Sequence, residues 1–118
     1  NEEELAEFAQ NLEDRFGDIP IQVQELFNAM RLKWLATGLG MERIIAKNGK
    51  MSCYFIQNQA SAFYETEVFE KILEFVKHFP THAQLKQTPK YLILNFNDID
   101  SLQQAKERLE DIEGFVYG

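Results

Sequence analysis

The sequence predicts a single α+β domain in which a helical hairpin precedes two β-hairpins, each followed by a helix. Near both ends of the chain, apolar residues recur at the three- and four-residue spacing of amphipathic helices. Asn48-Gly49 lies between β-branched and aromatic residues, which is typical of a two-residue β-hairpin turn. A chain of 118 residues with 45% hydrophobic content is long enough for one core. The expected order over residues 1–118 is ααββαββα.

The first two helices are expected to form a hairpin that extends to about residue 38. The apolar residues that share one face of the first helix are Leu5, Phe8, Ala9, Leu12 and Phe16. We expect Phe16 to fill the gap between the two helices. Pro20 is placed near the start of the second helix, where its missing N–H is tolerated, and Gly38 is placed as the C-terminal cap. The apolar positions assigned to the second helix are Val23, Leu26, Phe27, Met30 and Trp34.

Residues 41–57 are expected to form the first β-hairpin, because apolar and polar residues alternate on its second strand. Met51, Cys53 and Phe55 are assigned to one face of that strand, and Ser52, Tyr54 and Ile56 to the other. A third helix is expected over about residues 66–79, ended by Pro80, with a Glu67–Lys71 pair on its solvent side. The residues it is expected to bury are Phe69, Ile72, Leu73, Val76 and Phe79.

The second β-hairpin is expected to pair residues 84–87 with residues 90–96 across the Thr88-Pro89 turn. Residues 91–94 are apolar on both faces, which indicates a central strand. Asp98 or Asp100 is expected to cap the last helix, and Gly114 to lie just past its end. The residues of this helix that are expected to point inward are Leu102, Ala105, Leu109 and Ile112.

Composition limits the possible partners and compartment. Nineteen acidic and twelve basic residues give a net charge of −7, so the domain as a whole repels a phosphate backbone. The single cysteine excludes an internal disulfide, and no apolar stretch approaches the roughly 20 residues that span a bilayer. We therefore expect a soluble, cytoplasmic protein with no membrane contact. Because the chain begins at Asn1 rather than Met, directly inside a predicted helix, it is expected to be part of a longer multidomain protein.

No pattern in the sequence indicates catalysis or a bound cofactor. His78 and His82 have the spacing of helical metal ligands, but Pro80 between them breaks the helix, so a metal site is the less favoured alternative. The oxygen-rich residues 95–100 lack the glycine and glutamate of a calcium loop, and helix capping explains them better. Cys53 is expected to be an apolar core residue. We therefore assign no catalytic, cofactor-binding or metal-binding residue.

Basic residues are scattered along the chain and interleaved with acidic ones. Arg31, Lys33 and Arg43 come nearest to a basic patch. A nucleic-acid-binding domain would be expected to cluster basic residues on one surface, with exposed aromatic side chains beside them. We therefore expect no direct DNA contact by this domain, and keep a nucleic-acid-binding role as the alternative function.

Four segments resemble the C-terminal domain of the bacterial transcription-repair coupling factor family (Mfd). They are residues 12–20 (LEDRFGDIP), 29–33 (AMRLK), 39–41 (LGM) and 88–92 (TPKYL). The family pattern is LxDRFG-x-x-P, an ARLK-like helix, LGI and a PTRL-type strand. The resemblance extends from about residue 5 to the C-terminus, and the first block is its most specific part. Met30 departs from the small residue common there, and residues 57–83 align by pattern alone.

The resemblance implies a non-catalytic regulatory domain within an ATP-driven DNA translocase. Such proteins displace stalled RNA polymerase and recruit the repair protein UvrA, and their motor domains, elsewhere in the chain, use ATP and Mg²⁺. The C-terminal domain packs on a UvrB-like N-terminal module of the same chain and masks its UvrA-binding surface, which is autoinhibition. The family's polar contacts correspond here to Asp14 and Arg15, and Asn11 stands where the family can have a carboxylate.

Helical geometry supplies a surface for such a contact. At about 100° per residue, Glu4, Glu7, Asn11 and Asp14 lie opposite the apolar face of the first helix. The sequence therefore predicts an acidic face that is open to a partner. The alternative is that Asp14 and Arg15 form only local ion pairs with neighbouring residues, worth about 0–1 kcal/mol at a surface.

Overall fold

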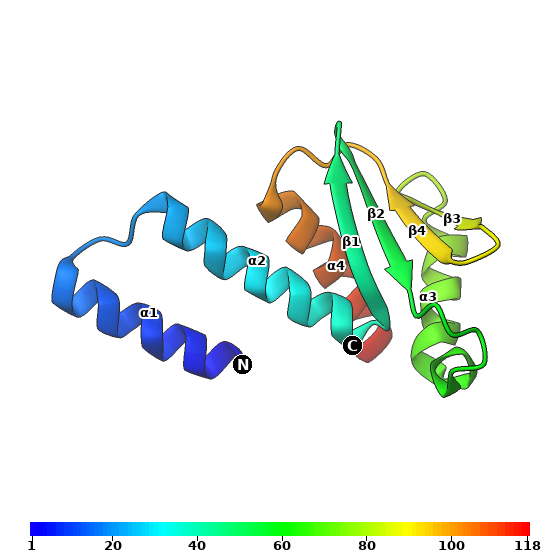
Figure 1. Cartoon of the computed structure of the whole chain (residues 1–118), viewed down its shortest axis with the longest axis horizontal. Helices are drawn as coiled ribbons and strands as arrows, with labels where there is room; N and C mark the ends of the chain where they lie inside the picture. The colour runs from blue at the N-terminus through cyan, green and yellow to red at the C-terminus, as the bar shows by residue number, and fades with distance from the viewer.

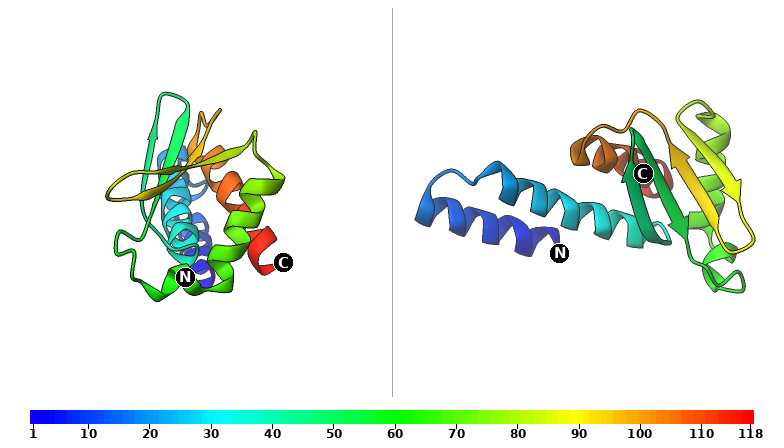
Figure 2. Two further views of the ribbon diagram at one scale, coloured as in Figure 1. Left: turned by 90° about the vertical axis from the view of Figure 1, so that its right-hand side faces the viewer. Right: turned by 45° about the horizontal axis from the view of Figure 1, so that its top comes forward.

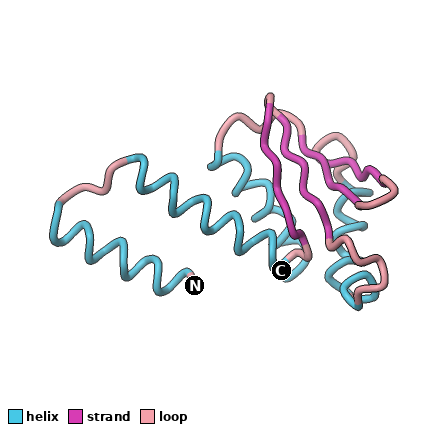
Figure 3. Tube along the Cα trace, in the orientation of Figure 1, coloured by secondary structure: helices cyan, strands magenta, loops and turns pink.

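The computed structural model describes all 118 residues, and its element order confirms the predicted α+β class (Figure 1). The elements are α1 (Glu2–Phe16), α2 (Ile21–Gly38), β1 (Met41–Lys47), β2 (Lys50–Phe55), α3 (Glu67–His78), β3 (Ala83–Gln87), β4 (Leu92–Phe96) and α4 (Leu102–Tyr117). A short 3-10 helix, η1 (Ala62–Glu65), precedes α3 and was not predicted. Figure 3 shows the helical hairpin on one side of the molecule and the strands and remaining helices on the other.

The four strands form one antiparallel sheet in the order β1-β2-β4-β3, so β4 is central, as predicted. The first hairpin turns at Asn48 and Gly49, whose φ angles of 53° and 76° are both positive, as a type I′ turn requires. On β2, Met51, Cys53 and Phe55 are fully buried, which confirms the predicted alternation. Helices α2, α3 and α4 cover this face of the sheet, and no element covers the other face (Figure 2).

The core lies between this covered face and the three helices. Cys53 pairs with Leu94 across β2 and β4, and Met51 pairs with Phe96. Helix α4 contributes Ala105, Leu109, Ile112 and Val116 to the core, and α2 contributes Leu32 and Ala36. Each large apolar side chain buried here contributes about 1.5–3 kcal/mol. The sheet and these helices therefore form the stable body of the domain.

Two predicted details of α4 are wrong. Its N-cap is Ser101, whose hydroxyl oxygen accepts from the backbone N–H of Gln104 at 3.1 Å, and neither Asp98 nor Asp100 takes this role. Asp98 instead has a φ of 59°, which places it in the turn that leads away from β4. The helix also continues through Gly114 to Tyr117, because Val116 adds a further buried contact in the last turn.

The predicted inward faces of α2 and α3 need correction. Phe75, which was not predicted, is buried on α3 together with Ile72, whereas Phe79 follows the helix and is 39% exposed. On α2, Leu26 and Met30 are exposed rather than inward-facing. The predicted Glu67–Lys71 pair is present at 3.8 Å.

The junction between α2 and β1 depends on a glycine. Gly40 has a φ of +76°, and a Cβ atom there would lie 2.2 Å from the Phe63 ring. Phe63 itself stacks on Phe55 at 6.1 Å between ring centroids and contacts Phe69 edge-on at 5.5 Å. Because these neighbours contact the ring, any shift of Phe63 would also disturb its packing against Phe55 and Phe69. The predicted terminator Gly38 lies inside α2 and has no such neighbour.

We expect Gly40→Ala to lower the free energy of unfolding by about 2–4 kcal/mol, because it combines a left-handed conformation with overpacking against Phe63. Chemical denaturation measures this change. The matched control is Gly38→Ala, two residues earlier, which should raise stability by up to about 1 kcal/mol through helix propensity. Equal effects of the two substitutions would contradict this account of the junction.

Burial raises the pKa of the Cys53 thiol to about 12, from its ordinary value of 9.0. The thiolate is the reactive form, so we expect native protein to react with a thiol reagent at about pH 8 only as fast as it unfolds. Because the folded pKa is raised, the stabilisation that comes from keeping this thiol protonated in the folded state is fully present below pH 9.0. It declines as the pH rises toward 12, because the thiol of the unfolded chain ionises first. Reaction rates with and without denaturant test this, and equally fast labelling of native and unfolded protein would contradict it.

Candidate protein-interaction site

Helices α1 and α2 form an arm that extends away from the sheet (Figure 1). Helix α1 runs back along α2 on the side away from the strands. The radius of gyration is 15.8 Å, whereas a compact domain of this length has about 13.5 Å. The molecule measures 49 × 30 × 26 Å. Much of the arm's surface is therefore left outside the body of the domain.

An aromatic pair and an ion pair join α1 to α2. Phe8 meets Phe27 edge-on at 6.2 Å between ring centroids, and the Arg31 guanidinium lies 3.0 Å from the Glu2 carboxylate. Leu5 is the buried residue of α1. An exposed ion pair contributes about 0–1 kcal/mol and an aromatic pair about 0.5–1.5 kcal/mol. The pairing with Glu2 also removes Arg31 from the basic patch suggested by the sequence.

Asn11, Asp14 and Arg15 all lie exposed on the last turns of α1. The Asp14 carboxylate accepts a hydrogen bond from the Gln10 side-chain amide at 3.0 Å. The Arg15 guanidinium lies 5.8 Å from the centroid of the Phe16 ring. The ion pairs of the chain involve other residues, so the local pairing considered as an alternative is not observed. Both charged groups are open to solvent beside the tip of the arm.

The prediction that Phe16 fills the gap between the helices is wrong, because its side chain is 77% exposed. The four residues 17–20 separate the helices and carry the chain around the tip, and Phe16 lies at the end of α1 facing this turn. A small cleft of about 230 Å³ opens there. It is lined by Leu12, Phe16, Gly17, Asp18, Ile19, Pro20 and Val23. We define these lining residues, with Asn11, Asp14 and Arg15, as the arm tip.

Helix α2 adds a second exposed apolar surface. Leu26 is 60% exposed, and Met30 and Trp34, at successive four-residue steps, are 39% and 36% exposed. Large apolar residues therefore occur on both the inward and the outward sides of α2. A helix that is apolar all round is normally covered all round. This pattern, visible in the sequence, could have predicted that part of the apolar surface of α2 is left uncovered by this chain.

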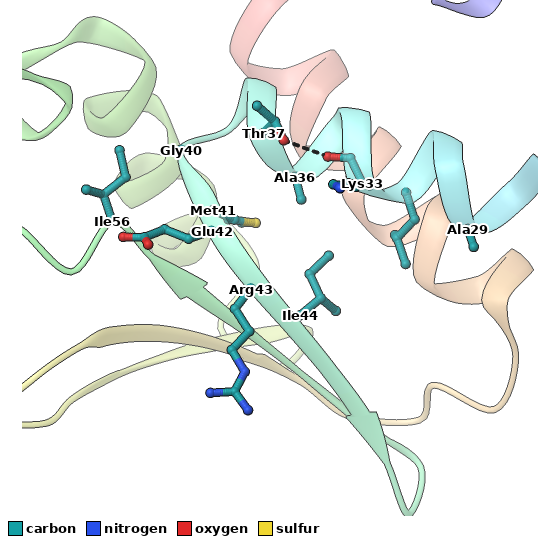
Figure 4. A pocket seen from close by; sticks show the side chains of 11 residues that line it. Ala29, Lys33, Ala36, Thr37, Gly40, Met41, Glu42, Arg43, Ile44 and Ile56 are labelled. Carbon is teal, nitrogen blue, oxygen red and sulfur yellow. Dashed lines mark hydrogen bonds between the residues drawn. The ribbon is translucent and has the colours of Figure 1, made fainter.

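A groove of about 500 Å³ separates α2 from β1 (Figure 4). Ile44 points toward α2 and Arg43 points away from it. Glu42, the groove's one carboxylate, accepts a hydrogen bond from the backbone N–H of Gln57. Its other ionisable residues are Lys33 and Arg43, and it contains neither histidine nor cysteine. The groove is an apolar crevice and shows no nucleophile paired with a base.

The two histidines lie against aromatic rings. His82 stacks on Phe79 at 5.9 Å with an interplanar angle of 5°, and His78 lies 6.0 Å from the Phe115 ring. No group of three or more His, Cys, Asp or Glu side chains is arranged to hold a metal ion. None of the helices combines the length and the apolar character needed to cross a lipid bilayer.

Comparison with known proteins connects this fold to one family. The family model described as the TRCF domain matches residues 1–66, which include the whole arm and the first β-hairpin. The chain is also similar to proteins named transcription-repair-coupling factor. Those of Rickettsia prowazekii and Rickettsia typhi are each 26% identical over 94 residues, and that of Rickettsia conorii is 27% identical over the same length.

These alignments cover 80% of the chain but only 8% of each relative. The similarity therefore concerns a small part of much longer proteins. The family model accounts for more than half of the chain, and it includes the arm tip and the glycine junction between α2 and β1. The chain belongs to the TRCF domain family, the domain of transcription-repair coupling factors that this family model describes.

Proposed function

We propose that this chain is the non-catalytic C-terminal regulatory domain of a transcription-repair coupling factor. In this proposal the arm packs on the UvrB-like N-terminal module of the same chain and masks the surface that UvrA uses. The observation that supports it most is the arm tip, where Asp14 and Arg15 are exposed on the last turn of α1 and an apolar cleft opens beside Phe16. Family membership supports the repair context.

The arm tip has the composition of a protein interface. Interfaces combine a buried apolar centre, rich in aromatic residues and arginine, with a polar rim. Phe16 and the cleft beside it provide the apolar centre, and Arg15, whose guanidinium lies 5.8 Å from the Phe16 ring centroid, provides a polar group next to it. Covering an exposed phenylalanine removes apolar surface from water at about 25 cal/mol per Å². Asn11 and Asp14 lie on the acidic face of α1, so a partner that contacts both the cleft and these residues would extend around the end of the helix.

Charge on α1 favours a basic partner surface. Glu4, Glu7 and Asp14 are exposed, and none of these carboxylates is paired with a lysine or arginine of this chain. A partner arginine that meets Asp14 in a partly desolvated interface makes a strong, charge-assisted pair. Asn11 supplies a neutral amide where the family can have a carboxylate, so that contact should be weaker in this protein.

The parent protein is proposed to be a cytoplasmic ATP-dependent DNA translocase that displaces stalled RNA polymerase. Its ATP and Mg²⁺ would be used by motor domains outside these 118 residues. The parent would then have two states. In the closed state the arm covers the UvrA surface, and in the open state UvrA is bound there. By linkage, whatever stabilises the closed state weakens UvrA binding by the same free energy.

Asp14→Ala should weaken binding of this domain to the isolated UvrB-like module by about 2–5 kcal/mol, because it leaves a partner charge unpaired. Its free energy of unfolding should change by no more than about 0.5 kcal/mol, because Asp14 is exposed. Calorimetric titration and thermal unfolding measure the two effects. Glu74→Ala, an exposed carboxylate on α3, is the matched control and should change neither. Unaltered binding of Asp14→Ala would argue against the arm tip as the interface.

Deletion of residues 1–118 from the parent protein should tighten its binding to UvrA, because the closed state is then lost. The measurement is the dissociation constant for UvrA with and without the domain. For typical coupling free energies of about 1–3 kcal/mol, affinity should rise about 5- to 150-fold. Asp14→Ala in the full-length protein should reproduce part of this gain. Equal affinities of full-length and deleted protein would leave the domain without a masking role.

A further inference from the structure

The uncovered face of the sheet concentrates basic residues that are scattered in the sequence. The strand register places Arg43 and Lys47 of β1, Lys50 of β2 and Lys86 of β3 on the face opposite Met51, Cys53 and Phe55. The sequence had suggested Arg31, Lys33 and Arg43 as the nearest thing to a patch, but only Arg43 belongs to this surface. We call this surface the open sheet face.

The carboxylates nearest to the open sheet face lie at its margins. Glu42, at the irregular start of β1, accepts a hydrogen bond from the backbone N–H of Gln57, and Asp100 lies near the turn at Gly49. None of the four basic residues forms an ion pair. In a chain of net charge −7, this face attracts anions while the rest repels them.

One row of side chains crosses all four strands. Arg43, Tyr54, Ile93 and Lys86 are successive cross-strand neighbours. At about 4.8 Å between strands, the two cationic residues are separated by about 14 Å. Of the two residues between them, Tyr54 is partly exposed and Ile93 is buried, at 7% exposure. The Arg43 guanidinium lies 5.6 Å from the Tyr54 ring centroid, and Tyr91 meets Tyr54 edge-on at 5.2 Å.

These groups match the chemistry of an unpaired nucleic acid strand. Bases stack on aromatic rings and on arginine planes, and cations at the rim neutralise phosphates. In the middle of the face the Ser52 hydroxyl and the Asn95 amide oxygen are hydrogen-bonded at 2.6 Å, which adds polar groups for base edges. A duplex keeps its bases stacked inside, so it could use only the basic rim. An acidic protein could also pair with the basic rim, but it offers no planar bases to stack on the rings.

The geometry points to binding of single-stranded DNA across the open sheet face of this domain. The requirement for an unpaired strand follows from the face itself, whereas the choice of DNA over RNA rests on the proposed function in repair. The open sheet face belongs to the strands and the arm tip to the turn between α1 and α2, so the two sites use separate surfaces (Figure 2). The domain could therefore hold a DNA strand whether or not the arm is docked.

The test is fluorescence anisotropy of a labelled oligothymidine of about 15 nucleotides, titrated with the 118-residue chain at several salt concentrations. Four phosphate contacts predict a slope of about −2.8 for log affinity against log salt, and loss of two contacts reduces it to about −1.4. Arg43→Gln combined with Lys86→Gln should therefore weaken binding by about 25-fold at about 0.1 M salt.

The control is Lys33→Gln combined with Lys77→Gln, which removes the same charge from exposed lysines on α2 and α3. It should bind almost as well as the unmodified chain. Equal weakening by the two double variants, or the absence of binding, would overturn the proposal. Tighter binding to the matching duplex would overturn the requirement for an unpaired strand, and tighter binding to RNA would overturn the choice of DNA. None of these results bears on the UvrA measurement, so the two proposals fail separately.

Discussion

The position of α2 is the constraint on which the rest of the molecule depends. Its C-terminal part is fixed to the body of the domain by the buried Leu32 and Ala36, and its junction with β1 is fixed by the tight contact between Gly40 and Phe63. Its N-terminal part has only α1 as a neighbour, through Phe8 and Phe27. One helix thus belongs to the core at one end and to an exposed arm at the other.

The net charge of −7 conceals two surfaces of opposite character. Glu4, Glu7 and Asp14 are exposed along α1, whereas Arg43 and Lys86 lie on the open sheet face. The net charge of the whole chain predicted repulsion from phosphate, but binding at one surface depends on the electrostatic potential there. Folding separates the charges because the helices of the body cover one face of the sheet and the arm projects away from it.

Elements governed by local rules were predictable from the sequence. Asn48 and Gly49 readily adopt the positive φ angles that a two-residue turn requires. The alternation of apolar and polar residues from Met51 to Phe55 determines which face of β2 is buried. The core assignment of Phe16 failed because helical periodicity identifies an apolar face without showing what covers it. The basic surface was missed because Arg43 and Lys86 are 43 positions apart in the sequence. They fall in one row across the sheet only because β2 pairs with β4. Asn11 and Asp14 are exposed, as the helical geometry predicted, and Arg15 is exposed beside them.

The length of α2 gives the arm a mechanical property. Its 18 residues span about 27 Å, and the body holds this helix only toward its C-terminal end. Because Leu32 and Ala36 anchor the C-terminal part of α2 in the core, movement of the arm relative to the body requires bending of the helix before Leu32. Any such bend would displace the arm tip further than it displaces the residues nearer the body.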